Sequence, residues 1–203
     1  QNLDIGSFLN ISGTNSEVAA TGQAVIGNLG LGYVTVEDGG LFTSSSAKIG
    51  NTFPLAPPGT GATQDPSEVI VTGTDSRWET TGVLEVADFG GKGILTITAG
   101  GTVINGSAVI ATTTGRGDVL VTGANSRWET TGSLLMADSA EAELNIAAGG
   151  TVNNSSAVIG TDFGTGRVIV DGAGSLWELD STATLGHNGG NGQLSISDDG
   201  QVI

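Results

Sequence analysis

The sequence predicts an all-β fold, a right-handed parallel β-helix (solenoid) of about eight three-stranded coils. Three observations lead to this prediction. Glycine occurs 35 times among 203 residues and aromatic residues make up only 4%, while abundant valine, isoleucine and threonine favour short strands joined by turns. A long motif recurs about every 50 residues. Inside that motif, pairs of apolar residues recur at the length of one solenoid coil.

The long repeat is clearest in residues 69–82 and 119–132, which share the run Ser-Arg-Trp-Glu-Thr-Thr-Gly. A third copy starts at Val168, and a fourth starts at Leu9 with Val18 in place of tryptophan. Residues 1–203 then form a single β-helix segment, which we interpret as a fragment of a longer array because both ends cut the pattern. The expected repeat units are residues 8–68, 69–118, 119–167 and 168–203.

The first strand of each coil is marked by an apolar-x-apolar pair such as Leu95-Thr-Ile97. Successive pairs are 24 to 26 residues apart, with one gap of 35. Because alternate side chains of a strand face opposite ways, both members of a pair point inward, and coils stacked about 4.8 Å apart must close the core. The second members form a predicted core ladder of Ile11, Val36, Val71, Ile97, Val121, Ile146, Val170 and Ile196.

Two further rows predict the second and third strands. We place the three tryptophans inside, where large residues alternate with small ones; the alternative is an outward carbohydrate-binding row with rings about 9.6 Å apart. The second-strand row is Val18, Leu41, Trp78, Val103, Trp128, Val152, Trp177 and Val202. The third-strand pairs are Ala24/Ile26, Ala47/Ile49, Leu84/Val86, Ala108/Ile110, Leu134/Met136, Ala157/Ile159 and Ala183/Leu185.

Turns are predicted between these strands. Glycine pairs such as 100–101 and 149–150 suit corners because a residue without Cβ adopts positive φ readily. A mostly polar row follows the third strand, and its side chains favour turns through hydrogen bonds to the backbone. This row is Asn28, Asn51, Asp88, Thr112, Asp138, Thr161 and His187.

An insertion at about residues 51–67 causes the long gap and holds all four prolines of the chain. Proline supplies no donor to a strand ladder, so this segment leaves the coil as a loop. Long loops on rigid scaffolds often bind ligands, although a neutral insertion is the alternative. The candidate binding-loop residues are Phe53, Pro54, Leu55, Pro57, Pro58 and Asp65.

The charge excludes two classes of partner. The net charge is −15 and the six basic residues are scattered singly along the sequence, so neither nucleic acid nor an anionic membrane is expected to bind. The chain has no cysteine, which excludes disulfides and thiolate metal sites. It also has neither an apolar run long enough for a transmembrane helix nor the opening of a signal peptide.

Catalysis has little support, and we predict no catalytic, cofactor or metal residues and no enzyme. His187 is the only histidine and lies in the turn row, which argues against a nucleophile-base pair. The pair Asp198-Asp199 would face opposite sides of a strand. The glutamates after each tryptophan, Glu79, Glu129 and Glu178, are interpreted as a solvated outer row. The calcium-binding nonapeptide of toxin repeats is absent.

The pattern Val-x-Val-x-Gly-x-x-Ser-x-Trp, followed by Gly-x-Leu-x-Ile-x-x-Gly-Gly-x-Val, resembles the repeats of autotransporter (type V secreted) passenger domains of the AidA-like adhesin group. The resemblance covers nearly the whole chain apart from the insertion. It implies a β-helical passenger at the bacterial surface, anchored through an outer-membrane barrel outside this segment. It also implies a role in adhesion, self-association or biofilm formation, with another copy, a host molecule or a glycan as partner.

Two other functions stay open at this point. The segment could belong to a polysaccharide-degrading β-helix enzyme whose cleft lies in other sequence. Alternatively, it could be a structural filament module that stacks end to end through uncapped coils. A lateral homo-oligomer is also compatible with the repeats.

Overall fold

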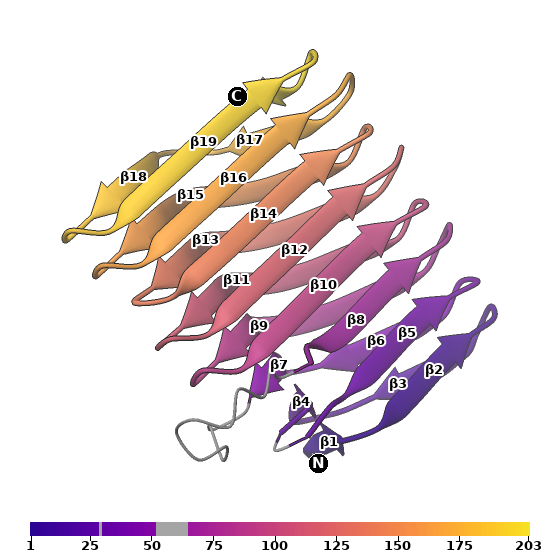
Figure 1. Cartoon of the computed structure of the whole chain (residues 1–203). Helices are drawn as coiled ribbons and strands as arrows, with labels where there is room; N and C mark the ends of the chain where they lie inside the picture. The colour runs from indigo at the N-terminus through magenta and orange to yellow at the C-terminus, as the bar shows by residue number, and fades with distance from the viewer. Residues whose placement is uncertain (29, 52–64) are drawn as a thin grey trace.

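A computed structural model describes residues 1–28, 30–51 and 65–203, and it confirms the predicted all-β parallel solenoid (Figure 1). One strand from each coil lies in an eight-stranded parallel sheet, so seven full turns separate its first strand from its last. In the described residues there is no helix, and hence none that could cross a membrane. The strands of this sheet are β2 (Phe8–Ser12), β5 (Tyr33–Glu37), β8 (Ser67–Thr72), β10 (Lys92–Thr98), β12 (Arg116–Thr122), β14 (Glu141–Ala147), β16 (Thr165–Asp171) and β19 (Asn191–Ser197).

A twelve-stranded parallel sheet forms the opposite wall of the solenoid. It holds the strands predicted as second and third in each coil. They are β1 (Leu3–Ile5), β3 (Glu17–Ala19), β4 (Gln23–Ile26), β6 (Leu41–Ser44), β7 (Ser46–Asn51), β9 (Arg77–Asp88), β11 (Thr102–Thr112), β13 (Arg127–Asp138), β15 (Thr151–Thr161), β17 (Leu176–Leu179), β18 (Ala183–His187) and β20 (Gln201–Val202).

The expectation of three separate strands per coil is wrong for the middle of the chain, where β9, β11, β13 and β15 each run through both predicted strands. The register of their pairing shifts half-way along, so the chain bends without leaving the sheet. Glycine permits this bend, because a Cβ at Gly82 or Gly106 would lie 2.6 Å from a carbonyl oxygen of the preceding coil. A β-bulge at such a position interrupts the ladder locally and bends the strand, and pairing resumes beyond it in a shifted register.

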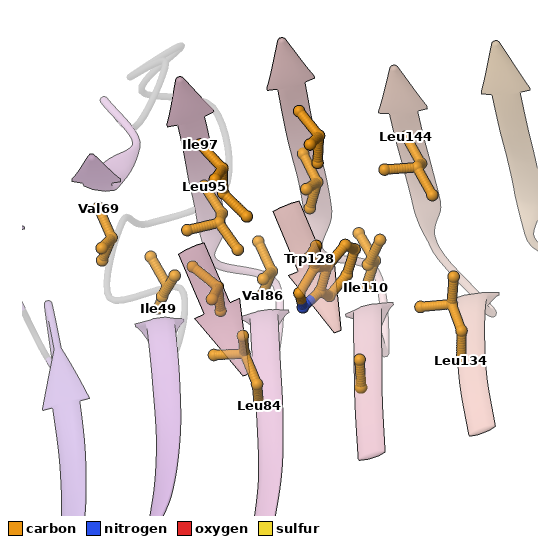
Figure 2. Packing of buried hydrophobic residues seen from close by; sticks show 14 of the residues in the cluster. Ile49, Val69, Leu84, Val86, Leu95, Ile97, Ile110, Trp128, Leu134 and Leu144 are labelled. Carbon is orange, nitrogen blue, oxygen red and sulfur yellow. The ribbon is translucent and has the colours of Figure 1, made fainter. Parts of the chain in front are cut away.

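The core lies between the two sheets and runs through the stack up to the last coil, where Leu185 and Ile196, predicted to point inward, are 45% and 51% exposed. Ile97 pairs with Val121, and Val121 with Ile146, so the first predicted ladder is in register from coil to coil. These side chains are fully buried. Figure 2 shows Leu95 and Ile97 of β10 opposite the side chains of Leu84 and Val86 of β9. Each coil thus closes its interior against its neighbours, as a solenoid requires.

The tryptophan row lies inside as well. Trp78, Trp128 and Trp177 are fully buried and alternate in register with Val103, Val152 and Val202, so no outward row of indole rings exists. One member of the row was assigned wrongly. The residue in register with Trp78 is Phe42, which is buried and stacks on that indole with ring centroids 5.5 Å apart.

Leu41, predicted for that position, is only half-buried and pairs with Arg77. The signal for the correct residue was present in the sequence. In the regular coils the inward valine is the second residue after a glycine pair, as Val103 is after Gly100-Gly101, and Phe42 has the same place after Gly39-Gly40.

Two buried asparagines accompany the tryptophans, and sequence reasoning missed both. Trp128 donates its indole N–H to Asn105 Oδ1 at 2.7 Å, and Trp177 donates to Asn154 Oδ1 at the same distance. Each asparagine comes two residues after a row valine and points into the coil stacked above it. Trp78 lacks such an acceptor, because Ser44 occupies the equivalent position and neither side chain has a hydrogen-bond partner among the described residues.

The serine of the repeated Gly-x-x-Ser-x-Trp motif ties one turn to the next. Ser126 Oγ accepts a hydrogen bond from the backbone N–H of Gly100 at 3.0 Å. Ser76 and Ser175 accept the same bond from the turns of the coils before them. All three serines are buried, so this bond satisfies a backbone donor that water does not reach.

Candidate functional site

The side chains considered for acid-base chemistry do not form a cluster. His187 is exposed on β18 and pairs with Thr161 of the preceding coil, while Asp198 and Asp199 form an exposed turn with positive φ. Within the described ranges, no group of three or more histidine, aspartate and glutamate side chains is placed to hold a metal ion. His187 therefore ends a strand, whereas Asp198 and Asp199 lie in the turn after β19 and not in a strand as predicted.

Most of the predicted binding loop, namely Phe53, Pro54, Leu55, Pro57 and Pro58, lies outside the described residues. Asp65 is described and exposed, just before β8.

Two described strands flank the insertion predicted at about residues 51–67. Asn51 ends β7, and Ser67 begins β8 as a buried residue whose Oγ accepts a bond from Gly32 N–H at 3.2 Å.

An ion-pair cluster lies beside the strand that precedes the insertion. Lys48 Nζ is 2.6 Å from Asp88 and 2.8 Å from Glu85, and Thr112 donates a hydrogen bond to Asp88. Burial opposes both charges, but the hydrogen bonds prevail: they raise the pKa of Lys48 and lower the pKa of Asp88 from their ordinary values. Because these charges satisfy one another, we interpret the cluster as a structural brace between β7 and β9.

A repeating polar surface lies on the outer side of the twelve-stranded sheet, and we call it the mixed-charge face. Its central feature is an arginine and a glutamate two residues apart on the same side of a strand. Arg77 lies 2.6 Å from Glu79 on β9, and Arg127 forms the same ion pair with Glu129 on β13. The face comprises two rows, Arg77, Thr102, Arg127, Thr151 and Leu176, and Glu79, Ile104, Glu129, Asn153 and Glu178.

The geometry of this face is regular. The two ion pairs are separated by β11, which puts them about 9.6 Å apart at the usual strand spacing. Arg77 and Glu79 are 48% and 40% exposed, and Arg127 and Glu129 are 50% and 35% exposed, so all four charges can reach a partner. Sequence reasoning identified the glutamates as an outer row but did not pair them with the arginines.

An open depression of about 480 Å³ continues the face towards β17. Arg127, Glu129, Asn153, Glu178 and Asp180 are among the residues that line it. Asn153 donates a hydrogen bond to Glu178 there. The depression therefore offers hydrogen-bond donors and acceptors and charges of both signs, but no deep apolar pocket.

Comparison with known proteins supplies the remaining observation. No family model and no solved structure matches the chain. One similar protein is the adhesin BmaC, an autotransporter of Brucella suis biovar 1 (strain 1330). The two sequences are 32% identical over 106 residues, which is 51% of the length of the present chain. This similarity and the parallel β-solenoid agree with the resemblance seen in the repeats. The chain fits an autotransporter passenger domain.

The chain spans 3% of the length of that adhesin. The fold itself accounts for the repeats, because each motif residue has a place in the core, in a turn or on the mixed-charge face.

Proposed function

We propose that this chain is part of a non-enzymatic adhesin passenger at the bacterial surface, and that it acts by binding a second copy of itself through the mixed-charge face. The observation that carries the proposal is the exposed arginine–glutamate pair repeated on alternate coils. The similarity to BmaC, an autotransporter adhesin, supports the surface location and the adhesive role.

The face is complementary to itself. When two copies meet in antiparallel orientation, an arginine of one copy can approach a glutamate of the other, and the intramolecular pairs then become part of a shared network. Each exposed ion pair contributes little alone, about 0–1 kcal/mol. The described chain supplies two such pairs at fixed spacing, so the two contacts of one face act together.

The overall charge of −15 opposes association at long range. At physiological ionic strength the Debye length is about 8 Å, so this repulsion is largely screened while contacts within the face persist. We therefore expect self-association to need moderate salt and to remain specific for this face.

A charge-swap experiment tests the proposal. Beads coated with the original chain are expected to clump. Beads coated with only one variant, either Arg77→Glu/Arg127→Glu or Glu79→Arg/Glu129→Arg, are expected not to clump. Mixing the two variants should restore clumping, because each face then meets its opposite charge.

The matched control is Arg167→Glu. Arg167 lies on β16 in the other sheet, 3.6 Å from Glu143, with 50% of its side chain exposed. This variant should clump like the original chain. Clumping by each swapped variant alone, or none after mixing, would refute self-association through this face.

A further inference from the structure

We infer that a groove on one edge of the solenoid binds a neutral oligosaccharide. The edge groove, as we call it, lies where the chain passes from the twelve-stranded to the eight-stranded sheet. It has a volume of about 500 Å³ and is independent of the mixed-charge face. Its lining residues are Lys92, Thr114, Gly115, Arg116, Ser139, Ala140, Glu141, Phe163 and Thr165.

The groove exists because one corner is shorter than its neighbours. Asp138 pairs with Thr112 and Thr161 at the end of the long strands. On the other side of the corner, Glu141 pairs with Arg116 and Thr165. Two residues, 139 and 140, connect β13 to β14, whereas three residues, 113–115 and 162–164, form the corners on either side. The short corner is the floor of the groove, and the longer ones are its walls.

Phe163 stands on one wall in an unfavourable conformation. Its φ is 69° and its exposure is 87%, so neither the backbone nor burial explains an aromatic residue there. The same place in other corners is held by Gly90, Gly189 and Thr114, all with positive φ, so Phe163 is the one aromatic residue among these four. A bulky residue in the left-handed region costs free energy, and such strain often marks a functional position.

The ring of Phe163 is held close to the next coil. A Cβ built on Gly189 would be 3.1 Å from the ring, so the glycine at that corner leaves space for it. Phe163 also lines the groove, and because 87% of its side chain is exposed its aromatic surface is open to a ligand. Aromatic side chains of this kind stack against the apolar faces of sugar rings, while polar groups around them bind the hydroxyls.

The polar groups of the groove suit hydroxyls better than a charged ligand. Arg116 is 3.2 Å from both Asp118 and Glu141, and these two carboxylates together offset the positive charges of Arg116 and of Lys92, which forms no ion pair among the described residues. Ser139 Oγ donates to the carbonyl oxygen of Asp162 at 2.9 Å and keeps its lone pairs for a ligand. With a chain charge of −15 around it, the site does not favour an anion.

The length of the groove indicates more than one sugar. Lys92, Arg116, Glu141 and Thr165 lie in register on four successive coils. Three steps at the strand spacing give roughly 14 Å. The ligand class is therefore a short neutral oligosaccharide lying along the solenoid axis.

Titration calorimetry of the chain with maltotriose, cellotriose, mannotriose and N,N′,N″-triacetylchitotriose tests the inference, with trigalacturonic acid as the acidic probe. At least one neutral probe should bind saturably, and more tightly than the acidic one. Phe163→Gly should weaken that binding about tenfold, equivalent to about 1.4 kcal/mol. Glycine already occupies this place in two other corners, so the variant should fold.

Phe8→Ala is the matched control, because Phe8 is 66% exposed on β2 and distant from the groove in sequence and register. It should leave binding unchanged. The inference is overturned if no neutral probe binds, if trigalacturonic acid binds more tightly, or if Phe163→Gly binds as well as the original chain. None of these results bears on clumping through the mixed-charge face.

Discussion

The buried hydrogen bond between Trp128 and Asn105 allows a prediction about stability. Substitution of Asn105 should change the free energy of unfolding in opposite directions, depending on whether Trp128 is present. Asn105 Oδ1 accepts the indole N–H at 2.7 Å, and both side chains are almost completely buried. The amide nitrogen of Asn105 has no hydrogen-bond partner among the described residues. Asn105→Leu is close in shape and removes both polar atoms of the amide.

The magnitude follows from what each variant leaves unpaired. In the original chain, Asn105→Leu leaves the buried indole N–H of Trp128 without an acceptor, which costs about 1–3 kcal/mol. In a Trp128→Phe background no indole N–H remains, and the same substitution removes an amide whose oxygen keeps only the 3.4 Å hydrogen bond from Thr130 Oγ1. There it should be neutral or stabilising, which gives a coupling free energy of about 2 kcal/mol.

Urea-induced unfolding of the four proteins of this cycle, followed by circular dichroism, measures the coupling. The volume lost in Trp128→Phe is common to both of its variants and cancels in the cycle. If Asn105→Leu changes the free energy of unfolding equally in both backgrounds, the reasoning is refuted and the asparagine is retained for another reason.

Three further predictions concern stability, each measured by urea titration. Ser44→Asn should raise the free energy of unfolding by about 1 kcal/mol, because it offers an acceptor to the unpaired Trp78 N–H; no gain would contradict this. Asp88→Asn should lower the free energy of unfolding at neutral pH. The difference from the original chain should vanish as the pH falls below about 3.9 and through the lowered pKa of Asp88, where the carboxylate becomes protonated. A difference that persists in acid would contradict this. Gly101→Ala should cost about 1–3 kcal/mol, since its Cβ would lie 2.4 Å from a carbonyl oxygen of the preceding coil, whereas Gly6→Ala, in open space, should cost little.

The stacking of coils could be predicted from the sequence because it depends on period alone. An inward residue such as Ile97 recurs at the length of a coil, and no other arrangement buries that pattern. The error at Leu41 arose where the coil lacks tryptophan or valine, so the hydrophobic signal did not distinguish two adjacent apolar residues. The glycine pair before them fixes the position, because it sets where the corner ends.

The sites were harder to predict than the core. Asn105 and Asn154 look like surface residues in the sequence, and only their distance from the tryptophan of the next coil reveals the hydrogen bond. Lys92 and Arg116 seem isolated along the chain, yet they are partners in neighbouring strands. Phe163 carries no periodic signal, since its importance comes from the backbone conformation it adopts.

The unequal corners have a consequence for how such a protein can change. Pairing is in register on both sides of residues 139–140, although that connection is one residue shorter than its neighbours. The strands that flank the insertion, β7 and β8, are likewise one strand of the twelve-stranded sheet followed by one of the eight-stranded sheet. Deletions and insertions at these corners change the surface of the solenoid, whereas the register of the strands and the packing of the core are unchanged. This edge can therefore acquire new recognition properties by small changes in length, independently of the selection that preserves the packed interior.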